Sequence, residues 1–179
     1  SEGEFFEAVN WAAREALPVL FFIQDNKYAI SVPVAQQTAG ASVFEVTKGF
    51  KGLERIRCDG TNFVETYAAV HRAVLQLRNG AGPVLLVADV VRLLPHSSSD
   101  DHLKYRNKED LEKEKQRDPL PQMARYLIEQ GYLTDHEATE MQDQAKKVVE
   151  AAADWAETRP LPEASTVQLH VYGEAHANP

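Results

Sequence analysis

A chain of 179 residues in which 44% of side chains are hydrophobic can bury the core of one domain, with or without an appendage. The formal net charge of -8 argues against a nucleic-acid-binding surface, which needs clustered Lys and Arg side chains, and fits an acidic enzyme better.

Cysteine content and hydropathy limit the cellular compartments in which the protein can be expected. Cys58 is the only cysteine, so an internal disulfide and a cysteine-based metal cluster are both excluded, and we expect a small buried apolar side chain. No apolar stretch approaches the roughly 20 residues that cross a bilayer, and the opening residues lack the basic-then-apolar pattern of an export signal. These features predict a soluble, cytoplasmic protein.

The first predicted elements are a helix and a strand. Apolar residues at helical spacing predict a helix over residues 2–15, and the opening SEGE matches a capping box. Because the sequence begins on a helix cap, we expect further sequence upstream. Residues 19–23 (VLFFI) are continuously apolar, which is typical of a parallel strand buried on both faces.

The next elements complete an α/β pattern. We expect a short helix near 43–50, a strand near 53–58 and a turn at Asp59-Gly60. Asn62 and Glu65 can cap a helix with apolar positions from Phe63 to Leu77, and 84–91 (VLLVADVV) is a second apolar strand. Strands alternating with helices predict a parallel sheet flanked by helices.

The charged segment from residue 108 onward reads as a C-terminal helical extension. We expect a solvated helix or loop at 107–117, a helix at 122–130, and a longer helix after a capping box formed by Thr134 and Glu137. An apolar stripe from Ala138 to Trp155 predicts that this helix packs along another surface. We expect residues 167–172 to form an edge strand or a partner-binding tail. The predicted domains are therefore 1–107 and 108–179.

Ligands of parallel α/β sheets bind at the carboxyl ends of strands, which directs attention first to residues 24–31. Asn26 offers an amide oxygen and Tyr28 a backbone carbonyl, and both are hard ligands of the kind that Mg²⁺ prefers. Asn and Asp after a strand are commonly turn formers, so the motif alone leaves both interpretations open.

The second polar segment, residues 92–106, is richer in reactive groups. It holds a histidine that can move protons (His96) and an arginine that can grip an anion (Arg92). A flexible surface loop with incidental charge is the alternative. A Ser-His-Asp hydrolase is disfavoured, because no small-residue elbow surrounds Ser97, Ser98 or Ser99.

Both segments resemble motifs of one enzyme family. Residues 1–5 (SEGEF) and 24–33 (QDNKYAISVP) are similar to the second half of the thiamine diphosphate motif in alpha subunits of 2-oxo acid dehydrogenases. Residues 92–101 (RLLPHSSSDD), with Tyr105-Arg106, resemble the active-site loop of that family. Asp118-Pro119-Leu120 and Val171-Tyr172 extend the resemblance over essentially the whole chain.

This resemblance implies a thiamine-diphosphate-binding fold, present in part, and a set of site residues. Asn26 (side chain) and Tyr28 (carbonyl) would be Mg²⁺ ligands, and His96 would assist transfer of the acyl group to a lipoyl domain. Ser97 matches a residue that is phosphorylated in mitochondrial relatives. The implied cofactor-binding residues are Gln24, Asn26, Tyr28, Ile30 and His96, and the implied active-site loop residues are Arg92, Ser97, Asp100, Tyr105 and Arg106.

The resemblance also implies partners and a reaction. The family decarboxylates a 2-oxo acid on thiamine diphosphate and Mg²⁺ in a two-alpha, two-beta assembly, and passes the acyl group to the lipoyl domain of an acyltransferase. The closest resemblance is to bacterial branched-chain members, with a pyruvate- or acetoin-specific enzyme as the alternative. Two departures concern cofactor affinity: the usual Asn-Asn is Asp25-Asn26, and a position that is often basic is Gln24.

Another departure is that the triplet which opens the cofactor motif, and which carries a further metal ligand, would lie upstream of Ser1. We therefore expect this chain by itself to be inactive. A truncated, non-catalytic assembly module is the second hypothesis.

Overall fold

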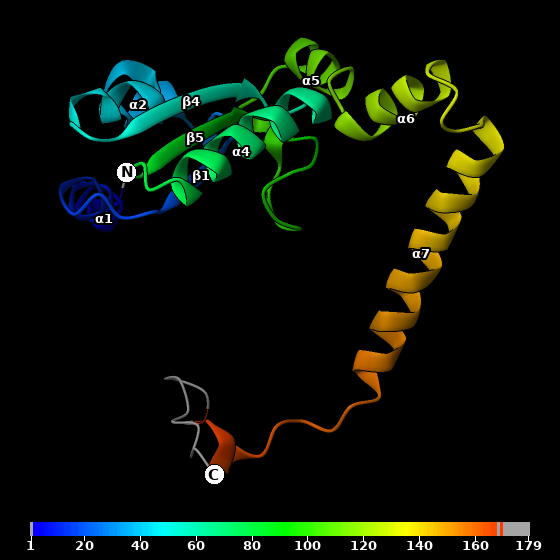
Figure 1. Cartoon of the computed structure of the whole chain (residues 1–179). Helices are drawn as coiled ribbons and strands as arrows, with labels where there is room; N and C mark the ends of the chain where they lie inside the picture. Colours follow the sequence, from blue (N-terminus) through cyan, green and yellow to red (C-terminus); the bar gives the residue numbers. More distant parts are fainter. Residues whose placement is uncertain (1, 168, 170–179) are drawn as a thin grey trace. The chain divides into compact units, whose positions relative to one another are not determined.

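The computed structural model describes residues 2–167 and 169, and the chain divides into two compact units, Ser1–Gln130 and Gly131–Pro179. Figure 1 shows the first unit as a sheet with helices on its faces. Each unit is described by itself below.

Helix α1 (Gly3–Arg14) and strand β1 (Leu20–Asp25) open the first unit. The helix predicted over 2–15 is confirmed, and it buries Val9 and Ala12. The ring of Phe5 contacts Phe21 of β1 edge to face, with 6.2 Å between ring centroids. The predicted cap by Ser1 lies outside the described residues.

Three parallel strands form the central sheet. Strands β1, β4 (Glu54–Asp59) and β5 (Val84–Asp89) pair in the order β1-β5-β4, so β5 lies in the middle. Residues Val84 to Ala88 are all buried, which explains why this segment is continuously apolar. The predicted α/β class with a parallel sheet is confirmed.

Helices cover both faces of the sheet. On one face lies α4 (Phe63–Arg78), which begins at the predicted cap residue, Asn62, and ends before Asn79. The other face carries α3 (Val43–Val46), whose Phe44 carbonyl accepts a hydrogen bond from Arg55 of β4 at 2.6 Å. The core beneath α4 contains Ile56, Cys58, Ala73, Val84, Leu86 and Ala88.

Cys58 lies in this core, as its sequence context indicated. The side chain is buried, and burial raises the pKa of its thiol. The expectation that Cys58 is a small buried apolar residue is therefore confirmed, and a reactive thiolate is disfavoured.

A short antiparallel hairpin follows β1. Strands β2 (Tyr28–Ala29) and β3 (Val32–Pro33) pair across Ile30 and Ser31. Short helical segments continue from there to β4: α2 (Val34–Gln37), a 3₁₀ turn at Ala39–Ala41, α3 and a second 3₁₀ turn at Thr47–Gly49.

The segment after β5 contains a long loop and two helices. A 3₁₀ turn spans His102–Lys104, and α5 (Lys108–Lys115) buries Leu111, so the predicted solvated segment is a helix with one anchored side chain. Helix α6 (Pro119–Glu129) begins at Asp118, whose side chain accepts a hydrogen bond from the Leu120 amide at 3.0 Å.

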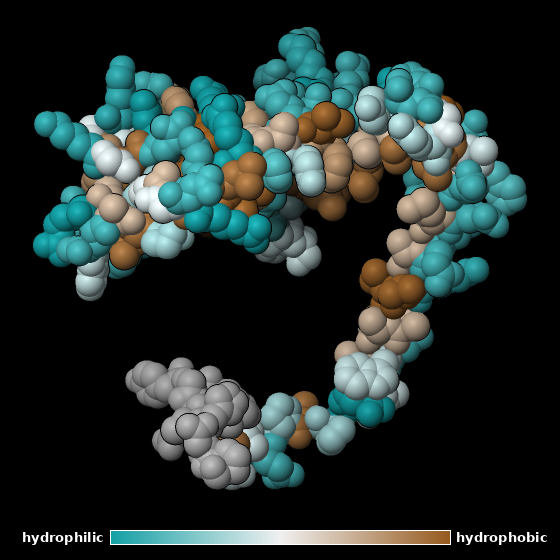
Figure 2. Space-filling view, in the orientation of Figure 1, coloured by the Kyte–Doolittle hydropathy of each residue, from teal (hydrophilic) through white to brown (hydrophobic). Residues whose placement is uncertain are grey.

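The second unit consists mainly of α7 (Asp135–Glu157). The predicted capping box is confirmed, because Thr134 and Glu137 exchange hydrogen bonds with each other's main chain. Figure 2 shows apolar side chains along α7, and the large ones are exposed: Met141, Val148, Val149 and Trp155. A short 3₁₀ turn follows at Ala164–Thr166, and the strand or tail predicted at 167–172 lies almost wholly outside the described residues.

Within residues 2–167 and 169, no helix combines the length and hydropathy that crossing a membrane requires.

Candidate functional site

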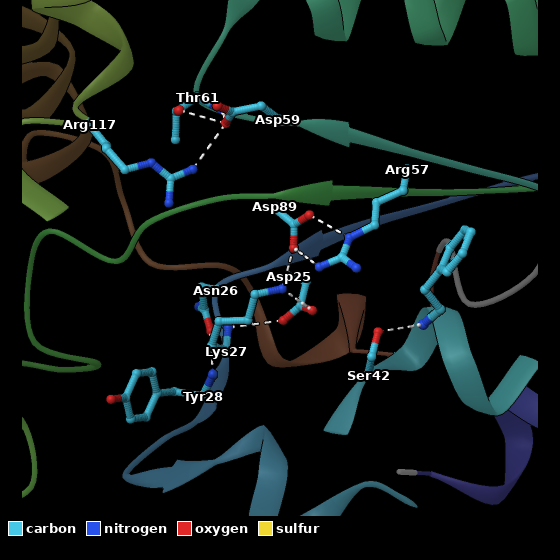
Figure 3. Close-up of polar contacts among 11 residues, drawn as sticks. Asp25, Asn26, Lys27, Tyr28, Ser42, Arg57, Asp59, Thr61, Asp89 and Arg117 are labelled. Carbon is cyan, nitrogen blue, oxygen red and sulfur yellow. Dashed lines mark hydrogen bonds and ion pairs between the residues drawn. The ribbon is translucent and has the colours of Figure 1, made fainter. Parts of the chain in front are cut away.

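The carboxyl ends of the three parallel strands each carry an aspartate. Asp25 of β1 pairs in register with Asp89 of β5, and Asp89 pairs with Asp59 of β4. Figure 3 shows that each carboxylate is matched by a basic side chain. Lys27 contacts both Asp25 and Asp89, and Arg117 contacts Asp59 at 3.1 Å. This edge of the sheet is the place where ligands of parallel α/β proteins bind.

The turn after β1 is fixed by its own polar groups. The Asn26 side-chain oxygen accepts a hydrogen bond from the Tyr28 amide at 3.0 Å, which is an Asx turn. The Asp25 carboxylate accepts one from the Lys27 amide at 2.9 Å. Gln24 is exposed and points to the opposite face of the strand from Asp25, and its side chain makes no hydrogen bond to the described residues. The structure therefore brings Asn26 and Tyr28 together and leaves Gln24 apart.

Arg92 connects the two segments that the sequence singled out. Its guanidinium donates to the carbonyl of Ile30 at 2.6 Å and to the Tyr105 hydroxyl at 2.6 Å. Ile30 adopts a left-handed conformation with φ of 55°, which turns the hairpin. Loop 92–106 is therefore tied directly to the hairpin that follows Asn26.

The ring of Tyr28 lies at the centre of this connection. The guanidinium carbon of Arg92 lies 5.0 Å from the Tyr28 ring centroid, and that of Arg106 lies 5.2 Å from it. The Tyr105 ring is 6.0 Å away from the same centroid. Cation–π contacts of this kind are stronger when the cation is desolvated, as Arg106 is.

Arg106 holds the far end of the loop. Its side chain is 1% exposed, donates to the Arg92 carbonyl at 2.8 Å and pairs with Glu114 of α5. The same guanidinium lies 3.4 Å from His102 Nδ1. Both ends of the loop are thus joined through the backbone of Arg92.

Asp100 links the middle of loop 92–106 to its end. Its carboxylate accepts hydrogen bonds from the Tyr105 hydroxyl at 2.6 Å and from the His96 amide at 2.9 Å. The Asp100 amide donates to the Ser97 carbonyl at 3.1 Å. Both His96 and Ser97 have exposed side chains, and the His96 ring makes no hydrogen bond to the described residues. The loop therefore orders its main chain through Asp100 and presents the imidazole outward.

The hydrogen bond between Tyr105 and Asp100 shifts the pKa of both side chains. The Tyr105 hydroxyl and then the His96 amide lower the pKa of Asp100. Desolvation, followed by the hydrogen bond to Asp100, raises the pKa of Tyr105. A lowered carboxyl pKa adds stability that is present above about pH 4 and is lost as the pH falls through the folded-state pKa. A raised tyrosine pKa adds stability that is present below about pH 10 and is lost as the pH rises through the folded-state value.

We therefore expect Tyr105→Phe to raise the titration midpoint of Asp100 toward that of an ordinary aspartate, because the largest lowering contact is removed. A ¹³C NMR titration of the carboxyl carbons measures this shift. Asp59 is the control, because Thr61 and Arg117 lower its pKa in spite of desolvation and none of them contacts Tyr105. An unchanged Asp100 midpoint would contradict the role given to this hydrogen bond.

Mg²⁺ binding can be tested against the donor atoms that are present. Within the described residues, no cluster of three or more His, Cys, Asp or Glu side chains has a metal-binding arrangement. The neutral oxygens of Asn26 and Tyr28 are suited to Mg²⁺. Pro33 lies opposite Tyr28 in the hairpin and has no amide proton, so it leaves the Tyr28 carbonyl unbonded from that side. These donors fit part of a site in which phosphate oxygens and further ligands complete the coordination.

Sequence reasoning missed the ion pairs beneath this site. Arg57, Asp89 and Lys27 were not among the predicted site residues, yet they link the three strand ends. The available signal was the aspartate that ends each apolar strand segment. The hydrogen bond to Asp89 raises the pKa of Arg57 in spite of desolvation. Desolvation would raise the pKa of Asp89, but the hydrogen bonds from Arg57 and Lys27 outweigh it and lower that pKa.

Comparison of the sequence with known proteins identifies the family of the chain. Residues 1–165 match the family described as dehydrogenase E1 component. The chain belongs to this family. The resemblance inferred from the two polar segments is therefore confirmed, and the chain is an alpha-subunit member of the 2-oxo acid dehydrogenase E1 proteins.

Curated relatives in this E1 family carry two kinds of name. The chain is 37% identical over 174 residues to 2-oxoisovalerate dehydrogenase subunit alpha of Bacillus subtilis, covering 97% of this chain and 52% of the relative. It is 35% identical to 3-methyl-2-oxobutanoate dehydrogenase subunit alpha of Mycobacterium tuberculosis, covering 97% and 47%. It is 30% identical to pyruvate dehydrogenase E1 component subunit alpha of Rickettsia bellii, covering 96% and 52%. The chain thus spans about half the length of the curated relatives it matches.

Proposed function

We propose that this chain is part of the alpha subunit of a thiamine-diphosphate-dependent 2-oxo acid dehydrogenase that acts on branched-chain 2-oxo acids in the cytoplasm. Residues 1–107 would be the C-terminal part of the cofactor-binding domain, and 108–179 a helical extension. The observation that carries this proposal is the link made by Arg92 between loop 92–106 and the hairpin after Asn26.

The turn after β1 would hold the cofactor through its metal. Asn26 through its side-chain oxygen and Tyr28 through its carbonyl would bind Mg²⁺, and Gln24 and Ile30 would lie along the cofactor. Thiamine diphosphate, when bound, supplies the electron sink that lets a 2-oxo acid lose carbon dioxide. The remaining contacts would come from the other half of a longer alpha chain and from a beta subunit in a two-alpha, two-beta assembly.

Loop 92–106 would manage acyl transfer. Its exposed His96 imidazole would hold or release a proton while the acyl group passes to the lipoyl domain of an acyltransferase. Hydrogen bonds of Arg92, Asp100, Tyr105 and Arg106 keep the loop in one conformation, which is the preorganisation that such a transfer needs. Phosphorylation of the exposed Ser97 would place negative charge beside His96.

The substrate class is supported by the pattern of relatives. Identity is 37% and 35% to the two relatives named for branched-chain substrates, and 30% and 31% to the pyruvate dehydrogenase subunits of Rickettsia bellii and Bacillus subtilis. A pyruvate- or acetoin-specific enzyme is the competing assignment.

The test is a decarboxylation assay of the full-length alpha chain with its cognate beta subunit, thiamine diphosphate and Mg²⁺. We expect kcat/KM for 3-methyl-2-oxobutanoate to exceed that for pyruvate by about tenfold or more, because each extra buried methyl group contributes a factor of about ten or more. A preference for pyruvate would overturn the substrate class. Failure both to decarboxylate either 2-oxo acid and to cleave acetoin, which has no carboxyl group to lose, would leave the assembly module as the better hypothesis.

A further inference from the structure

Four alternating charges form a row across the carboxyl edge of the sheet (Figure 3). Arg57 on β4 donates to Asp89 on β5 through Nε at 2.6 Å and Nη2 at 3.0 Å. Lys27 Nζ contacts Asp89 and also the Asp25 carboxylate, the latter at 2.6 Å. The row therefore runs from β4 through β5 to the turn that follows β1, and its formal charges cancel.

The two carboxylates of the row are less exposed than its two cations. The Asp25 side chain is 7% exposed and that of Asp89 is 22% exposed, whereas Lys27 and Arg57 are 40% and 47% exposed. Two poorly solvated carboxylates next to each other would repel, so Asp25 depends on Lys27 for neutralisation and Asp89 depends on Lys27 together with Arg57. This dependence fixes the position of the ammonium between them.

The backbone of Lys27 is held in a conformation that side chains rarely adopt. Its φ is 69°, in the left-handed region where a Cβ atom is crowded. Its amide donates to the Asp25 side chain at 2.9 Å, and its carbonyl accepts from the Val34 amide at 2.8 Å. Its side chain is the group that the Asp25 and Asp89 carboxylates bind, so main chain and side chain are fixed together.

Lys27 lies between the two residues that offer oxygens to a metal. A change in its backbone angles would move Asn26 relative to Tyr28, and would break the hydrogen bond of 3.0 Å between them. The ion pairs act on this segment from outside the set of donor atoms. Groups in such a position commonly tune metal affinity without touching the metal.

We propose that Lys27, Asp89 and Arg57 are positioning residues, which hold the turn of residues 25–28 in the conformation that presents Asn26 and Tyr28 to the metal. This inference rests on the proposed function. It assigns to β4 and β5, which carry none of the predicted ligands, a share in the geometry of the cofactor site. The competing explanation is that the row only stabilises the sheet.

The experiment measures Mn²⁺ binding by electron paramagnetic resonance, at saturating thiamine diphosphate, in the full-length alpha chain assembled with its beta subunit. The variants are Lys27→Met, Lys27→Gly and Arg57→Met. We expect each to raise the Kd for Mn²⁺ about tenfold. We expect the double variant Lys27→Met/Arg57→Met to raise the Kd by less than the product of the two single effects, because both residues act in part through Asp89.

Arg117→Met is the matched control. Arg117 and Arg57 have equally exposed side chains, at 47%, and each pairs with the aspartate that ends a strand. Arg117 belongs to a different pair, with Asp59, and has no contact with the row. Its variant should change the Kd for Mn²⁺ by less than twofold while losing a similar amount of thermal stability.

Lys27→Gly separates the effect of the ion pairs from that of the strained backbone, and Arg117→Met separates positioning from general stability. Glycine adopts a positive φ without strain, so this variant removes the ammonium without imposing a backbone cost in the folded state. If Lys27→Gly binds Mn²⁺ as tightly as the wild type, or if Arg117→Met weakens binding as much as Arg57→Met, the positioning role is wrong. If the wild-type enzyme binds no Mn²⁺, the proposed function fails and the positioning role fails with it.

Discussion

His96→Ala is expected to lower the rate of acyl transfer to a lipoyl domain by about 10²–10⁴-fold, the range typical for loss of a general acid or base. The imidazole is exposed and makes no hydrogen bond to the described residues, while the main chain of His96 is held through its amide by Asp100. Truncation at Cβ therefore removes the imidazole and keeps the hydrogen bond that orders the loop. We expect carbon dioxide release, followed with an artificial electron acceptor, to fall by less than about tenfold, since that step does not need the lipoyl arm.

His102→Ala is the control in the same loop. The His102 ring lies 3.4 Å from the Arg106 guanidinium, so this variant removes an imidazole that faces the protein instead of solvent. It should retain most of the transfer activity and lose some thermal stability. Full transfer activity in His96→Ala, measured with a saturating lipoyl domain, would rule out the proposed role.

The long apolar strands made the sheet predictable. A run such as Val84 to Asp89 contains no alternation of polar and apolar residues and is short for a helix, which favours a strand covered on both faces. Two such runs separated by helical patterns lead to a parallel sheet, and a parallel sheet places the ends of β1 and β5 at one edge. This is why both polar segments could be predicted from sequence as places where a ligand binds.

The hairpin after Asn26 could not be predicted in the same way. Its strands are two residues long, and its turn uses positive φ at Lys27 and Ile30, where sequence rules look for glycine. The Asp25 and Asp89 carboxylates hold Lys27, and Arg92 binds the Ile30 carbonyl. Tertiary contacts therefore stabilise this turn, and the sequence lacks the glycine that would have predicted it.

Ion pairs across the strands are a further limit of sequence reasoning. Arg57 meets Asp89 because Asp59 and Asp89 share a register, and a shift of one residue would place Arg57 on the other face. The apolar stripe of α7 shows a second limit, which concerns helix packing. The spacing predicted the helix and its apolar side correctly, but its large apolar side chains are exposed, and the prediction that they pack along another surface stays a prediction.

Arg106→Met is expected to destabilise the first unit by about 2–3 kcal/mol, with a fall in Tm of about 5–10 °C. The guanidinium side chain is 1% exposed, and its loss leaves the Arg92 carbonyl and the Glu114 carboxylate without their donor. Glu114 is 24% exposed, so water recovers part of its solvation and the cost stays below that of a fully buried pair. The Tyr28 ring also loses one of its two cations.

Arg55→Met is the comparison for Arg106→Met, because Arg55 also donates to a carbonyl, that of Phe44, and lies over an aromatic ring at 4.5 Å. It has no part in loop 92–106. Thermal unfolding should show a smaller loss for Arg55→Met, since no carboxylate loses its partner. Limited proteolysis should show faster cleavage after Lys104 only in Arg106→Met. Equal cleavage in both variants would mean that the Arg106 contacts add nothing specific to the order of the loop, and that its conformation depends on Arg92, Asp100 and Tyr105 alone.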